Sequence, residues 1–392
     1  MSVTVLRGPR KWLVDLWLML RVAVRGIGVL GPLGLIRELR AYMRDNRNVL
    51  DGSADRYLLR DGEVFAASAM PAVNSGRFAR YLLDEIVTFN HKRPSPMFFA
   101  LLSTSARCPY RCRHCYALSE LGDEEVVPVD ALERTIRGLA SRDVRNIFLT
   151  GGEPMYRAGE LPALLEATAD DVDAFWLVST GWHMDRAALE PLLAHKLKGV
   201  VISLDGRTAE RVNRIKGHRE AFDNAVSAVR TAVELDLLVS VDCMVDAELL
   251  DEDEYFGYIA FLRGLGVHFV NFFPPHTIGG VEKYDIPTLS NDELLRLEAL
   301  METVNRGGEH RGDPIAYSAV VWERRRGCSA GQQFLYVDPR GDVRPCPFLR
   351  LPAGNIVDTP IEEVIDAMRA VGEQGGCYSQ YEGLETGQRT SE

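Results

Sequence analysis

The 392-residue sequence lacks a block of lysine and arginine, and its net charge is −11. Proteins that bind nucleic acid through phosphate contacts concentrate positive charge on one surface. A nucleic-acid partner is therefore not expected. The sequence also lacks low-complexity tracts and repeats of fixed period, and its composition is that of an ordinary globular protein.

Long uninterrupted apolar runs are also missing. The stretch 12–36 is very apolar, but Lys11, Asp15, Arg21 and Arg25 border or interrupt it. A membrane span needs about 20 consecutive apolar residues. On a helix these four charges occupy roughly a third of the circumference and leave a broad apolar face. We predict a helix that either packs on the rest of the protein or lies on a membrane surface. No signal-peptide cleavage site follows, so we expect a cytoplasmic protein, peripheral to the membrane in the second case.

Cysteine is scarce, and its distribution excludes a disulfide framework. Of seven cysteines, three fall within eight residues as Cys108-x3-Cys112-x2-Cys115. They follow an apolar run, 97–102, that is typical of a buried strand. Three thiolates leave a metal centre one protein ligand short. A closed zinc site needs four ligands, whereas a three-cysteine [4Fe–4S] cluster keeps one iron open to a small molecule.

From Pro96 onward, strands alternate with amphipathic helices. Six such units predict an α/β fold with a parallel sheet curved as a partial (β/α)6 TIM-like barrel. The chemistry of such folds sits at the carboxyl ends of the strands, where the cysteine loop lies. We divide the chain into residues 1–95, an N-terminal accessory region with a helix and a hairpin, 96–306, the barrel, and 307–392, a C-terminal hairpin-plus-helix extension. The predicted barrel strands are 97–104, 146–149, 174–178, 199–204, 237–242 and 268–273.

A second motif follows the next strand as Gly151-Gly152-Glu153-Pro154. The two glycines allow a close approach to a ligand, and the carboxylate can accept a hydrogen bond from an ammonium group. A Gly-Gly turn between a strand and a helix is common by itself. Together with the cysteine loop one strand earlier, the motif is far more specific.

With these motifs, residues 97–275 resemble the radical S-adenosylmethionine (radical SAM) superfamily. The three-cysteine signature stands here as Cys108, Cys112 and Cys115, and the Gly-Gly-Glu motif as Gly151-Gly152-Glu153. The segment 203–223 also looks like peptide- and cofactor-maturing members. The resemblance implies a [4Fe–4S] cluster whose open iron binds SAM. An external donor such as flavodoxin or ferredoxin would reduce it, and a 5′-deoxyadenosyl radical would take hydrogen from the substrate.

The resemblance also implies roles for single residues. Gly151, Gly152 and Glu153, followed by Pro154, would meet the methionyl ammonium of SAM. Thr180 and Ser203, at the ends of the third and fourth strands, would bind its carboxylate or ribose. His114 would lie near the adenine.

Three further residues stay open. Asp205 either contacts the substrate or caps the following helix. His276 follows an aromatic strand end and is a candidate substrate contact. Cys243 is expected to be a buried, inert thiol.

The C-terminal region contains a second cysteine set, Cys328, Cys346 and Cys377. The spacing Cys328-x12-Gly341-x4-Cys346 resembles the twitch or shortened SPASM extension of radical SAM enzymes, which holds an auxiliary [4Fe–4S] cluster. Ligand count excludes two auxiliary clusters. One auxiliary cluster, a zinc or other metal site, and unliganded cysteines remain open.

The leading hypothesis is a radical SAM enzyme that abstracts hydrogen from a peptide, a small-molecule intermediate or a lipid. The alternatives are a cluster-bearing scaffold or electron-transfer protein without radical catalysis, and a zinc-stabilised binding module.

Overall fold

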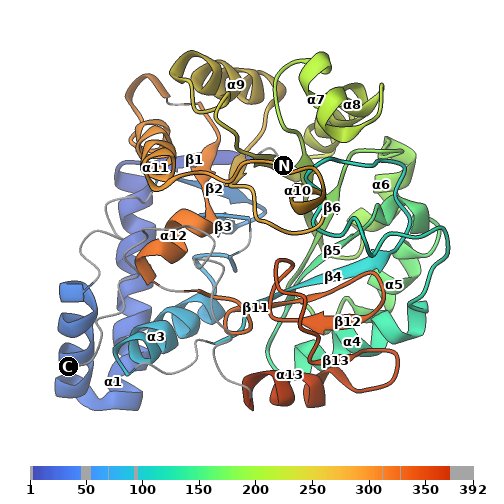
Figure 1. Ribbon diagram of the computed structural model, residues 1–392. Coiled ribbons are helices and arrows are strands. Elements are labelled where there is room, and N and C mark those ends of the chain that lie inside the picture. The colour runs from blue at the N-terminus through green and yellow to red at the C-terminus, as the bar shows by residue number, and fades with distance from the viewer. Residues whose placement is uncertain are drawn as a thin grey trace.

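The computed structural model describes residues 3–45, 54–68, 70–91, 96–310, 312–326 and 328–370. Within them, an open sheet of ten strands forms the centre of the molecule (Figure 1). Its order is β10-β9-β8-β7-β6-β5-β4-β11-β12-β13, and neighbouring strands from β10 through β11 run parallel. The strands are β4 (Phe99–Ser105), β5 (Asn146–Gly151), β6 (Ala174–Ser179), β7 (Leu197–Ser203), β8 (Leu238–Met244), β9 (Phe269–Phe273), β10 (Ile315–Tyr317), β11 (Phe334–Val337), β12 (Asp342–Arg344) and β13 (Gly354–Asn355).

All six predicted barrel strands are present as β4 to β9, which confirms the α/β, partial-barrel prediction. Their apolar runs are buried because helices cover the sheet, as parallel sheets require. A capping box of Ser290 and Glu293 starts α11. The helices of this region are α4 (Val129–Ser141), α5 (Leu161–Thr168), α6 (Arg186–Leu193), α7 (Ala209–Lys216), α8 (Ala221–Glu234), α9 (Glu252–Leu265), α10 (Gly280–Lys283) and α11 (Asn291–Asn305), with 3-10 turns η1 (Pro154–Arg157) and η2 (Gly308–His310).

The N-terminal region has its own three-stranded sheet, β1 (Thr4–Arg7), β2 (Arg56–Arg60) and β3 (Glu63–Phe65), with the predicted hairpin between β2 and β3. Helix α1 (Pro9–Asp45) packs against α3 (Gly76–Asn90).

The prediction of one continuous helix over 12–36 is wrong at Gly31. This residue has a φ of 70°, and Pro32, which follows, cannot donate a helical hydrogen bond. The chain turns there, and Figure 1 shows the two arms of α1 side by side at the left edge of the molecule. In the described part of the chain, no helix combines the length and hydrophobicity needed to cross a bilayer.

The C-terminal extension is built into the main sheet rather than appended to it. The predicted hairpin is present as β11 and β12, and β11 pairs in parallel with β4, the strand that leads into the cysteine loop. Phe334 stacks on Phe99 across this junction with ring centroids 4.9 Å apart. Helix α12 (Ala319–Arg326) follows β10, and α13 (Ile361–Ala370) packs against α4.

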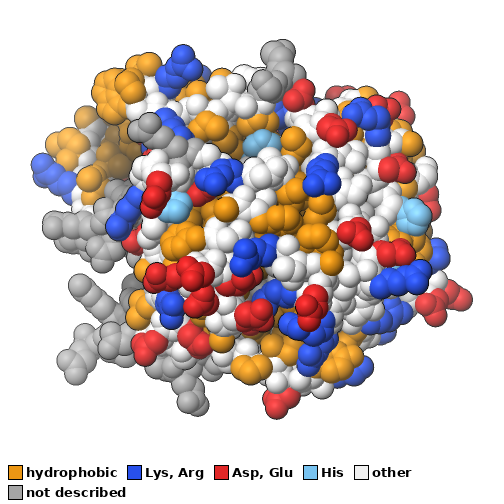
Figure 2. Space-filling model, turned by 90° about the horizontal axis from the view of Figure 1, so that it is seen from above, with side chains coloured by type: hydrophobic (Ala, Val, Ile, Leu, Met, Phe, Trp, Pro, Cys, Tyr) orange, Lys and Arg blue, Asp and Glu red, His pale blue; other side chains and the backbone are white. Residues whose placement is uncertain are grey.

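On the face seen in Figure 2, lysine and arginine side chains are interspersed with aspartate and glutamate side chains. Neither sign of charge dominates that face.

Candidate active site

The cysteine loop leaves the carboxyl end of β4, and main-chain hydrogen bonds from three elements hold it in place. The Gly152 and Glu153 amides donate to the carbonyls of Ser105 and Arg107, each at 2.7 Å. Within the loop, the Arg113 amide donates to Ile215 at the end of α7 at 2.9 Å. On its far side, the Gly280 amide of α10 donates to the Cys115 carbonyl at 2.8 Å. The loop is thus fixed by the ends of β5, α7 and α10.

Two of these contacts need glycine. A Cβ atom on Gly152 would lie 2.3 Å from the Arg107 carbonyl oxygen, and one on Gly280 would lie 2.3 Å from that of Arg113. Real Cβ atoms do not approach backbone oxygen so closely, so any side chain would push the loop away. In the described structure, Gly152 therefore lets the backbone of the cysteine loop pack directly against the end of β5.

The three thiols are in an environment that suits metal ligation better than free nucleophilic chemistry. Burial raises the pKa of Cys108 and Cys115 to about 12, and it also raises the pKa of Cys112. A bound metal ion reverses this by deprotonating the thiols that coordinate it. Among the described residues, no three His, Cys, Asp or Glu side chains converge on a single-ion site. A cubane spreads its thiolates over separate irons, so it needs no such convergence.

The Glu153 carboxylate is fully buried and binds four protein donors. One oxygen accepts from the Met155 amide at 3.2 Å and the Ser179 hydroxyl at 2.8 Å. The other accepts from the Thr180 amide at 2.8 Å and the Thr180 hydroxyl at 2.6 Å. A carboxylate has about four acceptor positions, and all are used here. Glu153 therefore ties the end of β5 to the end of β6 and fixes Thr180.

A buried ion pair lies beneath the loop. The Lys216 ammonium is 2.7 Å from Asp205, and these side chains are only 2% and 1% exposed. Lys216 also donates to the hydroxyl of Ser203, while the Met244 amide donates to Asp205 at 2.9 Å. Burial alone would raise the pKa of Asp205, but the neighbouring Lys216 ammonium lowers it to about 2. Asp205 is thus held ionised.

The structure bears on two residues that the sequence left open. The N-cap of α7 is Thr208, whose side chain accepts from the Arg211 amide, so the capping role for Asp205 is wrong. Cys243 is fully buried in the core, as expected for an inert thiol.

His114 lies beside this pair, with its Nε2 3.7 Å from Asp205. Burial lowers the pKa of His114 to about 4, so the ring is neutral near pH 7. Sequence reasoning missed Lys216. It ends the helix that follows Ser203-Leu204-Asp205, and its place just before Gly217 is the clue that could have identified it.

A second carboxyl group, which sequence reasoning also missed, lies further along the sheet. Asp242 on β8 accepts from the Asn271 amide nitrogen on β9 at 3.4 Å. Burial raises the pKa of Asp242 to about 7, which makes it a group that exchanges a proton near neutral pH. Its position between two apolar strand residues, Val241 and Cys243, gave no pattern that would single it out.

His276 is 2% exposed and contacts the C-terminal extension. Its ring stacks on Phe348 with centroids 3.9 Å apart and planes 3° apart, and its Nδ1 lies 2.9 Å from the Pro274 carbonyl oxygen. Phe348 also meets Tyr116, the residue after Cys115, edge to face at 6.0 Å. An aromatic contact therefore joins the cysteine loop to the segment that follows Cys346.

The described residues of the second cysteine set lie on this side of the sheet. Cys346 is buried, and Cys328 is partly buried against the main core. Burial raises the pKa of Cys346 to about 12, and the nearby Cys328 adds to the rise. Cys377, the third predicted ligand, lies outside the described residues.

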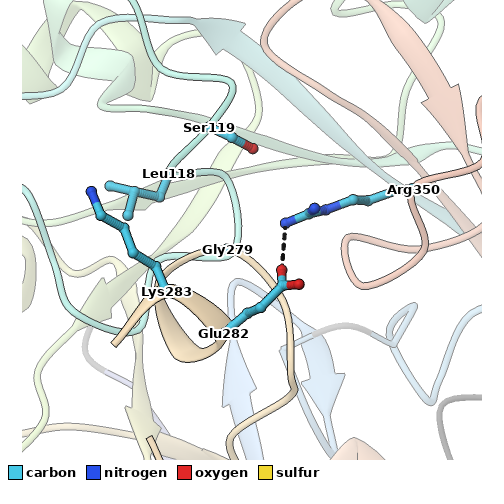
Figure 3. A pocket seen from close by; sticks show the side chains of 6 residues that line it. All are labelled: Leu118, Ser119, Gly279, Glu282, Lys283 and Arg350. Atoms are coloured by element: carbon cyan, nitrogen blue, oxygen red, sulfur yellow. Dashed lines mark hydrogen bonds and ion pairs between the residues drawn. The ribbon is translucent and has the colours of Figure 1, made fainter. Parts of the chain in front are cut away.

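A cavity of about 320 Å³ opens where the cysteine loop, α10 and the C-terminal extension meet. Figure 3 shows Glu282 and Arg350 reaching toward each other across it, joined by an ion pair of 3.1 Å. Its lining residues are Leu118, Ser119, Gly279, Glu282, Lys283 and Arg350. A single cavity thus touches both cysteine-bearing parts of the chain.

Two protein families match the two parts of this site. Residues 102–254 match the radical SAM superfamily, and residues 328–377 match an iron–sulfur cluster-binding domain, SPASM. The first segment contains the cysteine loop, Glu153, Asp205 and Lys216. The second contains all three C-terminal cysteines.

Relatives support the same assignment. A GTP 3′,8-cyclase of Helicobacter pylori J99 is 28% identical over 44% of this chain and 54% of its own length, so the chain spans about half of that protein. An AdoMet-dependent heme synthase of Methanosarcina barkeri is 24% identical over 66% of this chain and 79% of its own.

Solved structures share the fold. Streptococcus suis SuiB bound to the precursor peptide SuiA superposes with a TM-score of 0.58 at 16% identity, covering 77% of this chain and 72% of that one. The anSMEcpe structure with AdoMet and a peptide gives 0.51 at 17% identity, covering 68% and 80%. At these identities the likeness is one of fold.

Proposed function

Since residues 102–254 belong to the radical SAM superfamily and residues 328–377 to the SPASM iron–sulfur domains, we propose that this enzyme removes a hydrogen atom from a peptide. A [4Fe–4S] cluster and SAM are its cofactors, with auxiliary iron–sulfur binding in the second domain. Bound cluster and SAM supply the 5′-deoxyadenosyl radical. The observation that carries the proposal is the cysteine loop fixed by β5, α7 and α10 directly above the buried Lys216–Asp205 pair.

In this proposal Cys108, Cys112 and Cys115 hold the SAM-binding cluster. Because the acceptor positions of Glu153 are already used, the carbonyls of Gly151 and Gly152 would accept from the SAM ammonium. Pro154 starts the η1 turn behind them.

The SAM carboxylate would lie against Lys216 and Ser203, which are already in contact. Asp205 would then position Lys216 rather than touch the substrate. Thr180, fixed by Glu153, would face the ribose, and the neutral His114 ring would pack near the adenine.

The proposed substrate side is the cavity between α10 and the C-terminal extension. Its Lys283 and Arg350 offer donors to peptide carbonyls or carboxylates, and its Glu282 offers an acceptor. The structures of SuiB and anSMEcpe that share this fold hold peptides, which favours a peptide over a small molecule or a lipid. His276, stacked on Phe348, would support the cavity wall. We further propose that Cys328, Cys346 and Cys377 hold one auxiliary cluster and that a flavodoxin or ferredoxin supplies electrons.

The test is anaerobic reconstitution with iron and sulfide, followed by dithionite and SAM. We expect 5′-deoxyadenosine, and Cys112→Ala should abolish it and remove about four irons per chain. Cys243→Ala is the matched control, because that thiol is buried outside the site, and it should retain both. A reconstituted protein that yields no 5′-deoxyadenosine would overturn the proposal. Stimulation by peptides encoded beside the gene, compared with nucleotides and lipids, tests the substrate class.

A further inference from the structure

Helix α1 has an apolar face that the described structure leaves exposed. Seven side chains on its first arm project away from the protein at helical spacing and fall within about 140° of the helix circumference. Val24 is 66% exposed and Leu20 is 61% exposed, so these are outward-facing groups. The seven are Trp12, Leu13, Leu16, Met19, Leu20, Val24 and Ile27.

The second arm, beyond the turn at Gly31, also has exposed apolar side chains. Leu33 is 82% exposed, Met43 is 56% exposed and Ile36 is 45% exposed. Single exposed apolar residues are common, but ten of them on the two arms of one helix mark an interaction site. We call these ten side chains the α1 apolar face.

The opposite side of α1 is already occupied. Leu18, Val22 and Leu35 are buried in a cluster with Phe78 and Ile86 of α3. The helix therefore has apolar groups on two sides, and only one of them is needed to hold it on the protein.

The charges of α1 are also sorted by side. Asp15 accepts from Lys11 at 2.9 Å and from the Tyr57 hydroxyl at 2.7 Å, while Glu38 accepts from Asn90 at 2.8 Å. Both carboxylates thus contact the protein body. Over residues 9–43, where the exposure of α1 side chains is described, the exposed charged side chains are arginines: Arg10, Arg21, Arg25, Arg37 and Arg40.

The net charge of α1 is opposite in sign to the net charge of the whole chain. Residues 9–45 contain seven basic and three acidic residues, a net charge of +4, in a chain whose net charge is −11. Arginines that flank an exposed apolar face match the acidic headgroups and acyl boundary of an anionic bilayer.

We propose that α1 docks this enzyme on the surface of an anionic phospholipid bilayer, with the α1 apolar face in the headgroup–acyl boundary and the arginines on the phosphates. The helix lies on the membrane, because no described helix is long and apolar enough to cross it. A second copy of the chain fits less well, since pairing two such faces brings arginines against arginines. Residues 371–392 fit less well too, because they hold only five hydrophobic residues and carry four acidic residues against one arginine.

The experiment is sedimentation of the full-length, cluster-loaded protein with vesicles. Vesicles of phosphatidylcholine with about 30 mol% phosphatidylglycerol should pellet the protein, and pure phosphatidylcholine should pellet much less. Raising the salt concentration should weaken binding, because screening acts on the arginine contacts.

Two variants and a matched control localise the contact. Leu16→Glu/Ile27→Glu should lower vesicle affinity by about tenfold or more, and Arg21→Glu/Arg25→Glu should remove the preference for anionic vesicles. Leu295→Glu places the same charge on an exposed leucine of α11 and should bind as wild type. Circular dichroism and melting temperature confirm that each variant is folded.

Three results would each overturn the proposal. In the first, the wild-type protein stays in the supernatant with both kinds of vesicle. In the second, the Leu16→Glu/Ile27→Glu variant binds vesicles like wild type. In the third, the wild type binds no vesicles but forms a dimer, and the Leu16→Glu/Ile27→Glu variant is monomeric. None of these measurements requires turnover, so the outcome is independent of whether the proposed hydrogen abstraction is correct.

Discussion

The Lys216 ammonium and the Asp205 carboxylate lie 2.7 Å apart, each almost completely excluded from solvent, below the loop that contains the three clustered cysteines. The same lysine closes α7, and its carbonyl accepts from the Arg111 amide of the loop at 3.3 Å. Lys216 therefore joins the cysteine loop through its backbone to the end of β7 through its side chain, and Asp205 extends the link to Met244 at the end of β8.

Replacing Lys216 by methionine should strongly destabilise the protein. The variant leaves the Asp205 carboxylate buried without its counter-charge, which costs about 3–5 kcal/mol in comparable cases. Urea unfolding measures this loss, and equilibrium dialysis under anaerobic conditions measures the expected loss of SAM binding. Lys198→Met is the control, because its partner Glu63 is 40% exposed and the change should matter little. Equal destabilisation by both variants would contradict the role assigned to Lys216.

Replacing Glu153 by glutamine should impair SAM cleavage while leaving most of the fold intact. The glutamine amide nitrogen would replace one carboxylate oxygen, so the two donors bound to that oxygen would lose their acceptor. A buried donor without an acceptor costs about 1–3 kcal/mol. Because Thr180 would lose its fixed position, 5′-deoxyadenosine formation should fall by about tenfold or more. Glu160→Gln introduces the same change on a nearby exposed side chain and should leave the rate unchanged. A Glu153→Gln enzyme of normal rate would show that the four contacts are dispensable.

Asp242 should make stability depend on pH. Burial raises the pKa of its carboxyl from 3.8 to about 7, so the folded protein retains a proton that the unfolded chain releases. The free energy of unfolding should therefore fall as the pH rises from about 4 to about 7, and this contribution should be flat above that window. The urea concentration at the unfolding midpoint, measured across this pH range, should fall less steeply with pH for Asp242→Asn than for wild type. Asp223→Asn, on the exposed side of α8, should retain the wild-type slope.

The sequence was sufficient for features with local patterns. Apolar strands such as β6 and helical stripes such as α8 follow from periodicity, and the cysteine spacing identified the loop because its ligands are close in sequence. Contacts between distant segments left no such pattern. The pairing of β11 with β4 joins residues more than 200 positions apart, and nothing in either strand specifies the partner.

The residues of the site also divide into those that a local sequence pattern identifies and those that only contacts between distant segments reveal. Glu153 was identified from its motif, but its four donors come from the turn that follows it and from the next strand end, so the use of all its acceptors became visible only in three dimensions. Lys216 was missed because a lysine near a helix end is usually exposed, and only the buried Asp205 beside it makes it unusual.

Arg344 should couple the C-terminal extension to the cysteine loop. Its guanidinium donates to Glu120, just beyond the loop, at 2.6 Å and to Asp338 of the β11–β12 turn at 2.5 Å, and all three side chains are mostly buried. Arg344→Met leaves two carboxylates facing each other without a counter-charge, so we expect a loss of about 3–5 kcal/mol in urea unfolding. Iron content should also fall if the extension detaches. The matched control is Arg142→Met, since Arg142 joins α4 to Asp366 of α13 through an exposed pair and its loss should have little effect. Adding Glu120→Gln to Arg344→Met should restore part of the stability, because it removes one of the two unpaired charges. Failure of that second change to restore any stability would show that Arg344 acts through packing rather than through charge.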